Sequence, residues 1–175
     1  DEQSAQGTYG GKGKYLRVSY MPDMLSHAQV LTGTDYDACE GDLYACMMSE
    51  SVMDACGFTV GETLEFPLWE DTEGTTLKLY ISGIFRESDN TDIFWYKTPN
   101  SMEQEIFVSE ETFDAIVKQY APEKINYVTN VLLDYTKINQ ANVENVKYYI
   151  EQFHKEDDSF TDSFGNLLTQ YQKDK

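Results

Sequence analysis

Residues 49–64 read SESVMDACGFTVGETL, and this stretch decides the fold. Ser49 or Ser51 can cap the N-terminus of a short helix. Gly57 stands where that helix would end in the left-handed conformation, which glycine adopts without penalty. Gly61 then suits a tight turn before the strand-like run TLEFPLW. The stretch therefore predicts a short helix and a reversal leading into a strand, with a further strand before it in LYACMMS.

Hydrophobic periodicity extends this interpretation in both directions along the chain. Amphipathic helices are predicted at 109–120 and from Asn139 to Lys155. Residues 23–44 give mixed signals, and their latter half is typical of a loop. Strands are predicted at 15–21, 43–49, 62–69, 76–87, 93–98, 105–109 and 125–135. Strands and helices alternate irregularly, which favours an α+β fold with a mixed, largely hairpin-linked sheet and packed helices, in one body or two small lobes.

The longest predicted strand, residues 76–87, has a regular alternation of apolar residues. Because side chains of a strand alternate between its two faces, every second residue is expected to lie on the same face. These residues are Leu77, Leu79, Ile81, Gly83 and Phe85.

Composition excludes several classes of function. The chain has 175 residues, of which 41% are hydrophobic, and a net charge of −18. Such an acidic chain repels nucleic acid, so nucleic acid is not expected as a partner. No Lys or Arg lies between Arg17 and Lys78. The acidic surface either keeps the protein soluble or attracts a cationic partner. No apolar run is long enough to span a membrane.

The chemistry-bearing residues do not form a known catalytic or metal-binding motif. There is no G-x-S-x-G, no H-E-x-x-H and no P-loop, so the sequence predicts neither an enzyme nor a cofactor. Asp35 and Asp37 resemble the start of a calcium loop, but Glu40 occupies the position that needs glycine. We therefore expect no metal site.

Cysteines and aromatic residues leave two questions open. Cys56 lies on the apolar face of the predicted helix and is expected to be a buried free thiol, whereas a bridge between Cys39 and Cys46 is an open alternative. The consecutive aromatic residues Phe94, Trp95 and Tyr96 either pack into the core or form a surface for a partner or a sugar.

The order of several short motifs resembles one family. LTG at 31–33, MMSESVMDACGFTVGETLEF at 47–66, YISGIFRE at 80–87 and EIFVSEETFD at 105–114 closely resemble the extracytoplasmic, MacB-like periplasmic core domain of MacB/FtsX-type ABC transporter permeases. The resemblance covers about residues 31–115, half of the chain. Its structural motif residues here are Ser49, Glu50, Gly57, Gly61 and Gly83.

The resemblance implies a non-catalytic domain at residues 15–158 on the outer side of a bacterial cell membrane. It also implies a flexible juxtamembrane linker at 1–14 and a C-terminal stalk helix at 159–175 leading to a membrane span, with both ends leaving the domain on the same side. The implied partners are the membrane helices of the permease, a cytoplasmic ATP-binding subunit, and an extracytoplasmic protein or cationic peptide.

The implied role is to relay ATP-driven conformational change in peptide or drug export, lipoprotein handling or activation of cell-wall hydrolases. The alternative is a free-standing secreted module that binds carbohydrate or peptide. Hydrophobic stretches of about 20 residues on both sides of the domain would distinguish the permease from the secreted module.

Overall fold

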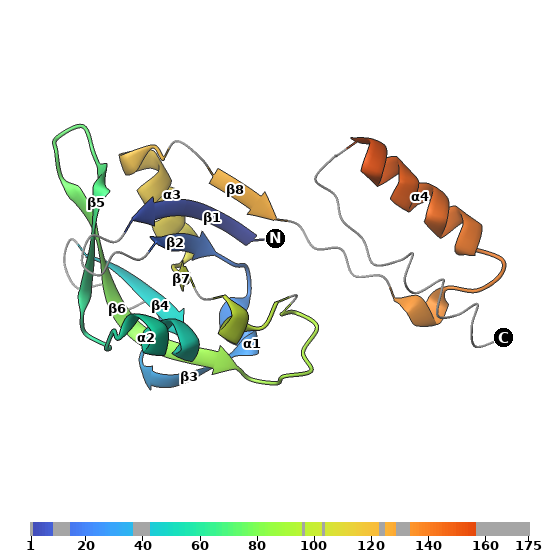
Figure 1. The fold of residues 1–175 in the computed structure, drawn as a ribbon, viewed down its shortest axis with the longest axis horizontal. Coiled ribbons are helices and arrows are strands. Elements are labelled where there is room, and N and C mark those ends of the chain that lie inside the picture. The colour runs from blue at the N-terminus through green and yellow to red at the C-terminus, as the bar shows by residue number, and fades with distance from the viewer. Residues whose placement is uncertain are drawn as a thin grey trace. The chain divides into compact units, whose positions relative to one another are not determined.

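The computed structural model divides the chain into two compact units, Asp1–Asn130 (unit 1) and Val131–Lys175 (unit 2). The residues that the structure describes are 2–8, 15–36, 43–95, 97–102, 104–122, 125–128 and 134–156. Unit 1 contains a sheet with short helices around it, and unit 2 contains the helix α4, Val143–Glu156 (Figure 1).

The described part of unit 1 forms one eight-stranded mixed sheet. Its order is β3-β6-β4-β7-β2-β1-β8, and β5 pairs with β6 outside this path. The pairs β2–β7 and β4–β6 are parallel, and the other pairs are antiparallel. The strands are β1 (Glu2–Thr8), β2 (Tyr15–Tyr20), β3 (Ala28–Gly33), β4 (Tyr44–Ser49), β5 (Thr63–Glu70), β6 (Thr76–Glu87), β7 (Glu105–Phe107) and β8 (Ile125–Val128). The mixed sheet confirms the predicted α+β class.

Among the described strands, β1–β2 and β5–β6 are hairpins between neighbours in the sequence. The remaining pairings join strands that are far apart in the chain. The strand β6 pairs with three others, β3, β4 and β5, and β4 joins it to β7.

The linker predicted at residues 1–14 is wrong for residues 2–8. These residues form β1, which pairs with both β2 and β8. The sequence of β1, EQSAQGT, is mostly polar. Its strand conformation is therefore supported by backbone pairing on both sides, and hydrophobic alternation does not reveal it. Residues 9–14 lie outside the described part of the chain.

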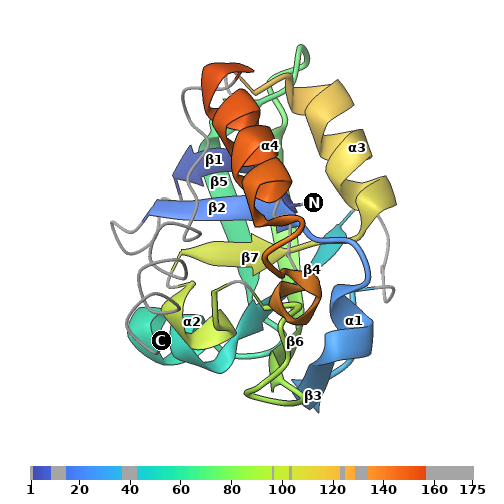
Figure 2. The same cartoon turned by 90° about the vertical axis from the view of Figure 1, so that its right-hand side faces the viewer.

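In the latter half of 23–44, residues 34–36 have no regular structure, as the predicted loop requires, and residues 37–42 lie outside the described part of the chain. The first half, where the sequence gives mixed signals, forms two elements. A short helix, α1 (Met24–His27), leads into β3. Figure 2 shows α1 next to the ends of β3 and β6. Among the described strands, β3 pairs only with β6, and all of its residues are exposed or half-buried. An edge strand of this kind lacks the apolar face that makes a buried strand visible in a sequence.

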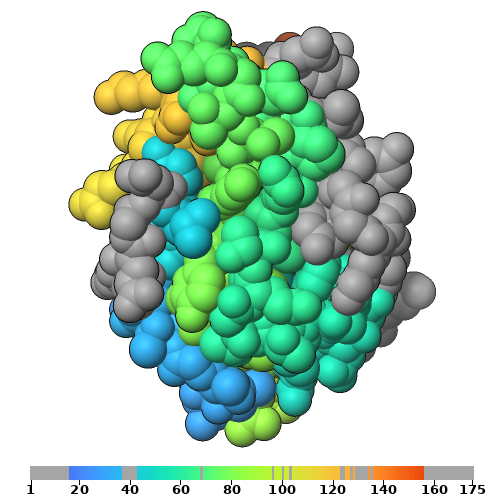
Figure 3. All heavy atoms as spheres, turned by 90° about the vertical axis from the view of Figure 1, so that its left-hand side faces the viewer, coloured from blue at the N-terminus to red at the C-terminus, as the bar shows by residue number. Residues whose placement is uncertain are grey.

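Both faces of the sheet carry a hydrophobic core. The alternate residues Cys46 and Met48 of β4 belong to one cluster, and Ala45 and Met47 belong to the other. Because successive side chains of a strand point to opposite faces, the two clusters lie on opposite sides of β4. The first includes residues of α2 (Glu50–Cys56), α3 (Glu110–Tyr120) and β5, and the second includes residues of α1 and of the segment after β6. Figure 3 shows unit 1 from the side on which β5 and α2 lie at the surface.

The expected alternation along β6 is interrupted in the middle of the strand. Cys46 lies opposite Ile81, but the next residue of β4, Met47, lies opposite Gly83, so Ser82 is an additional residue in β6. Beyond this bulge the faces exchange, because Phe85 belongs to the cluster opposite that of Ile81. The prediction that Phe85 shares a face with Leu77, Leu79 and Ile81 is therefore wrong.

The strand predicted at 93–98 is wrong, because 93–95 and 97–98 are turns and irregular structure. Asp92 Oδ1 accepts a hydrogen bond of 2.9 Å from the backbone N–H of Phe94, and Asp89 Oδ1 accepts one of 2.8 Å from Thr91 N–H. Aspartate side chains that bond to nearby N–H groups in this way compete with strand pairing. The aromatic content of the segment therefore does not make it a strand.

In unit 2, α4 confirms the amphipathic helix predicted from Asn139. It begins at Val143, and its half-buried apolar residues include Val146 and Ile150. Of the strand predicted at 125–135, Ile125–Val128 forms β8, residues 129–133 lie outside the described part of the chain, and Tyr135 is in a 3-10 turn, Tyr135–Lys137. The stalk helix expected at 159–175 lies outside the described residues. Within the described part of the chain, no helix has the length and apolar character needed to cross a bilayer.

Candidate functional site

The motif residues around α2 hold the helix at both ends. Ser49 is the N-cap, because its Oγ accepts a hydrogen bond of 3.4 Å from the backbone N–H of Val52. At the other end Gly57 has φ 66°, and its N–H donates to the Met53 carbonyl at 2.7 Å. Ser49 rather than Ser51 is thus the cap, and Gly57 has the predicted left-handed conformation.

Gly61 connects the turn after α2 to β6 by a backbone hydrogen bond. It has φ 95°, and its N–H donates to the Ile81 carbonyl at 2.9 Å. In return, Ile81 N–H donates to the Glu62 carbonyl at 2.9 Å. The turn therefore fixes where β5 begins to pair with β6.

Gly83 lies where the backbones of β3 and β6 approach each other closely. A Cβ atom built on Gly83 would lie 2.0 Å from the backbone oxygen of Thr34, and one on Gly33, its partner in β3, would lie 2.1 Å from the Ser82 oxygen. Ser82 Oγ donates to the Cys46 carbonyl at 3.0 Å, and Thr34 N–H donates to the Ser82 carbonyl at 2.9 Å. Only a residue without a side chain fits where β3 approaches the bulge of β6 this closely.

The fifth motif residue, Glu50, differs from the other four because it is exposed at one edge of the sheet. The parallel strands β4 and β6 end at this edge, with Ser49 opposite Phe85. β4 continues into α2, while β6 continues into the segment 88–102. Ser88 N–H donates to the His27 carbonyl at 2.9 Å, so this segment starts against α1. The carboxyl edge of parallel strands is a common place for ligand binding.

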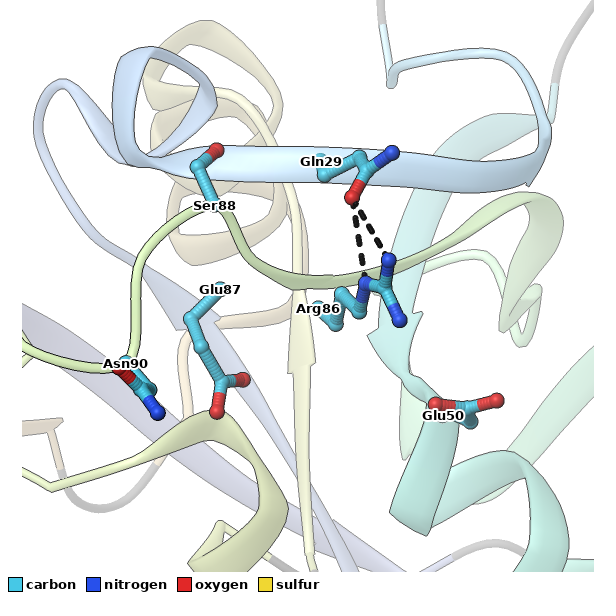
Figure 4. A pocket seen from close by; sticks show the side chains of 6 residues that line it. All are labelled: Gln29, Glu50, Arg86, Glu87, Ser88 and Asn90. Atoms are coloured by element: carbon cyan, nitrogen blue, oxygen red, sulfur yellow. Dashed lines mark hydrogen bonds between the residues drawn. The ribbon is translucent and has the colours of Figure 1, made fainter.

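A pocket of about 330 Å³ opens at this edge (Figure 4). It is lined by Gln29, Glu50, Arg86, Glu87, Ser88 and Asn90. Arg86 donates from Nε and Nη2 to Gln29 Oε1, at 3.2 and 3.0 Å, so the guanidinium is held against β3. Glu87 Oε2 is shielded from solvent and has no hydrogen-bond partner among the described residues. A shielded acceptor of this kind is costly to leave unsatisfied.

The aromatic residues singled out in the sequence lie on the same segment. Trp95 is 7% exposed, and its Nε1–H donates to the His27 carbonyl at 3.2 Å. Phe94 is half-buried and stacks on the His27 ring, with 3.8 Å between centroids and 3° between planes. Trp95 thus packs into the core, which is one of the two expected arrangements. Tyr96 lies outside the described residues.

His27 and Asp92 fasten the segment 88–102 from the side. His27 Nδ1 lies 2.6 Å from Asp92 Oδ2. The hydrogen bond from the Phe94 backbone N–H, followed by the one from His27, lowers the pKa of the Asp92 carboxyl below its usual value. The segment is therefore fixed to α1 by the His27–Asp92 hydrogen bond, a ring stack and the Trp95 hydrogen bond.

The cysteines and the residues that resemble the start of a calcium loop can be placed only in part. Cys46 and Cys56 are buried and neither is in a disulfide, which confirms the buried thiol at Cys56 and excludes a Cys39–Cys46 bridge. Burial raises the pKa of the Cys46 thiol far above its usual value. Asp37 and Glu40 lie outside the described residues. Among those that are described, no three His, Cys, Asp or Glu side chains are grouped to hold a metal ion.

Of the residues that line the pocket, Glu50 alone is singled out by the sequence analysis. Arg86, Glu87, Ser88 and Asn90 follow one another at the end of a predicted strand, so a polar run at a strand end is the available signal. Gln29 comes from β3, which has no strand pattern.

No protein-family model matches the chain, and no curated protein matches it. A similar solved structure is described as "a domain of a putative Permease protein" from Porphyromonas gingivalis; it has 14% sequence identity and a TM-score of 0.34, over 79% of this chain and 82% of the other. At this identity and TM-score the likeness carries no argument about function.

Proposed function

We propose that the chain is the extracytoplasmic domain of a MacB/FtsX-type ABC transporter permease. In this role it has no catalytic activity of its own. It relays ATP-driven conformational change from the membrane helices and a cytoplasmic ATP-binding subunit to a substrate or an extracytoplasmic partner protein. The domain is held at the outer face of a bacterial membrane by spans on either side of it.

The observation that carries the proposal is the position of the motif residues in the fold. Ser49, Gly57, Gly61 and Gly83 each meet a physical requirement of one continuous unit, β4–α2–β5–β6. The motif order that resembles the family is therefore the order of one packed structure, rather than a set of unrelated glycine turns. This correspondence supports the family interpretation over a chance similarity.

The environment of the potential nucleophiles supports a non-catalytic role. Ser82 is 3% exposed and its hydroxyl is used to bond β4. The Cys46 thiol is completely buried, and burial disfavours the thiolate form that would act as a nucleophile. A scaffold buried on both faces of β4 is instead suited to transmit displacement as a stiff body.

Membrane topology tests the proposal. In the full-length protein, with Cys39→Ser, a Glu73→Cys substitution adds a thiol at an exposed position in the β5–β6 turn. Cys46 and Cys56 are buried and should not react. We expect a membrane-impermeant maleimide to label Glu73→Cys in intact cells or spheroplasts, with the protein in the membrane fraction.

The matched control is the Cys39→Ser protein without the new thiol, which should remain unlabelled. Recovery of the protein as a secreted, unanchored module would favour the alternative of a free-standing binding module. Labelling only after the membrane is broken would place the domain on the inner side and contradict the proposal.

A further inference from the structure

The strand β3 stands at one end of the described sheet. It pairs with β6 and with no other strand in the part of the chain that the structure describes. Figures 1 and 2 both show β3 at the rim of unit 1. A strand in this position has one edge that faces away from the sheet, where backbone N–H and C=O groups are available to another chain.

The pairing with β6 shows which backbone groups lie on that outer edge. Ser88 N–H donates to the His27 carbonyl at 2.9 Å, so this pair exchanges hydrogen bonds across the ladder. In an antiparallel ladder, every second pair is bonded in this way, and the residues between them direct their N–H and C=O groups outwards. Ala28 and Val30 are therefore the outward residues, and among the described residues neither makes a backbone hydrogen bond outside the ladder.

The sequence of β3 lacks the residues that usually protect an edge. Natural edge strands carry charged residues or proline, which prevent pairing with another chain. The strand β5, which also pairs with β6 alone among the described strands, has Pro67 and the exposed Glu65 and Glu70. β3 reads AQVLTG, without a charge or a proline. Its bulge between Val30 and Thr32 limits an added strand to a few paired residues, so we expect modest affinity.

Charge selects the strand that fits this edge. No Lys or Arg lies between Arg17 and Lys78, a range that includes all of β3. The basic residues of β6 are already engaged, because Lys78 Nζ lies 3.7 Å from Glu65 Oε1 and Arg86 donates to Gln29. The net charge of −18 repels a second copy of the chain and attracts a cationic segment.

We propose that the outer edge of β3 binds an extended, positively charged segment of another protein, which joins the sheet as an additional strand. The backbone of the segment pairs with the outward groups of Ala28 and Val30. An aliphatic side chain of the segment covers Val30, which is 38% exposed. This inference does not rest on the proposed function, because the edge belongs to unit 1 however the domain is anchored.

Titration of the 175-residue chain with short peptides tests the proposal. The probe is acetyl-KVTVTVK-amide, which alternates apolar and polar residues and carries two charges. We expect saturable chemical-shift changes at the Ala28 and Val30 amides, with a Kd on the order of 0.1–1 mM. At a peptide concentration of ten times Kd, hydrogen exchange of the Val30 amide should slow by about 10-fold, because this N–H then donates to the peptide.

Two control peptides separate strand pairing from attraction by charge. Acetyl-KVTPTVK-amide has the same charge, but its central proline removes a backbone donor and disfavours the paired strand, so binding should weaken by about 10-fold or more. Acetyl-EVTVTVE-amide keeps the alternating pattern and reverses the charge. At low ionic strength it should bind at least about 5-fold more weakly than the lysine peptide.

Two equally exposed valines provide a matched pair of variants. Val30→Lys places a cation on the β3 edge, as natural edge strands do, and should weaken binding of the lysine peptide by about 10-fold. Val128→Lys adds the same charge to β8, at a position that is also 38% exposed, and should change Kd by less than about 2-fold. Exchange of the Val30 amide in the parent protein tests the proposal even if Val30→Lys impairs folding.

Four results would overturn the proposal. The first is an absence of saturable shifts at Ala28 and Val30, with unchanged exchange of the Val30 amide. The second is equal binding of the proline peptide, since this would indicate attraction by charge alone. The third is an equal loss of affinity in Val30→Lys and Val128→Lys. The fourth is a shift of the same amides that grows with protein concentration in the absence of peptide, which would make a second copy of the chain the occupant.

Discussion

Gly83→Ala should destabilise unit 1 strongly although it adds a single methyl group. The new Cβ would lie 2.0 Å from the Thr34 oxygen and 3.3 Å from the Thr32 oxygen. Both atoms belong to the backbone, so no side-chain rotation can relieve the clash. β3 would have to move away from β6, which would break the 2.9 Å hydrogen bond from Thr34 N–H to the Ser82 carbonyl.

The size of the effect follows from two contributions. Forcing an additional methyl group into a packed site costs about 1–3 kcal/mol. Loss of the Thr34 hydrogen bond adds about 1 kcal/mol. We therefore expect Gly83→Ala to lower the free energy of unfolding by about 2–4 kcal/mol. The control Gly74→Ala has φ +80° but no atom within 4 Å of the new Cβ. It should cost about 1–2 kcal/mol, from backbone strain alone.

Urea denaturation and amide hydrogen exchange measure the two effects separately. The urea concentration at the midpoint of unfolding should fall further below that of the parent protein in Gly83→Ala than in Gly74→Ala. In addition, the Thr34 amide should lose protection in Gly83→Ala and retain it in Gly74→Ala. The close approach of β3 and β6 would be refuted if Gly83→Ala left the exchange protection of the Thr34 amide unchanged and lowered the free energy of unfolding by less than about 1 kcal/mol.

Three further predictions concern titration and reactivity. Hydrogen bonds from the Phe94 backbone N–H and from His27 lower the pKa of Asp92. The ionised carboxylate should therefore stabilise the fold above about pH 4, and this stabilisation should disappear as the pH falls through the lowered pKa. In urea denaturation, Asp92→Asn should be less stable than the parent protein at pH 7 and about equally stable well below pH 4. Burial and a hydrogen bond to Glu110 raise the Tyr20 pKa to about 12, so stability should decrease between about pH 10 and 12. Because other tyrosines also titrate near pH 10, the test is the difference in absorbance near 295 nm between the parent protein and Tyr20→Phe, which should rise near pH 12; a difference that rises near pH 10 would contradict the raised pKa. The buried Cys46 thiol should react with iodoacetamide only after unfolding, as peptide mass spectrometry can show, and rapid labelling of the native protein would contradict the fold of β4.

The sequence predicts best those elements whose ends are determined by neighbouring residues. Ser109 Oγ accepts a hydrogen bond from Thr112 N–H at 3.2 Å, as its place before two glutamates predicts for α3. Ser49 and Gly57 determine α2 in the same way. In each case the donor, the acceptor and the required backbone conformation lie within a few residues of one another. A local sequence pattern is therefore sufficient to predict where these helices begin and end.

Pairing between distant strands is harder to predict. β1 has few apolar residues and β3 has no regular alternation of apolar residues, and their conformation depends on partners such as Tyr20 and Arg86 elsewhere in the chain. The bulge at Ser82 depends on the register between β4 and β6, which the sequence of β6 alone does not reveal. For this reason the face of Phe85 is mispredicted, although the strand itself is correctly placed.

The candidate site combines both situations. Glu50 is found because it belongs to the capped start of α2, and Arg86 and Glu87 come at the end of a predicted strand. Gln29 lies on an edge strand that has no periodic signal, so its contact with Arg86 cannot be anticipated. The pocket exists only because β3 and β6 meet in three dimensions.

The most direct measurement of the central claim is movement that depends on ATP. In the full-length permease complex with Cys39→Ser, spin labels at Glu73→Cys in unit 1 and Glu144→Cys in unit 2 occupy exposed positions. The relay role predicts that ATP changes the distribution of distances between the two labels. The change should be absent when the ATP-binding subunit cannot bind nucleotide. A distribution that is identical with and without ATP in the active complex would contradict the claim that this domain relays ATP-driven motion.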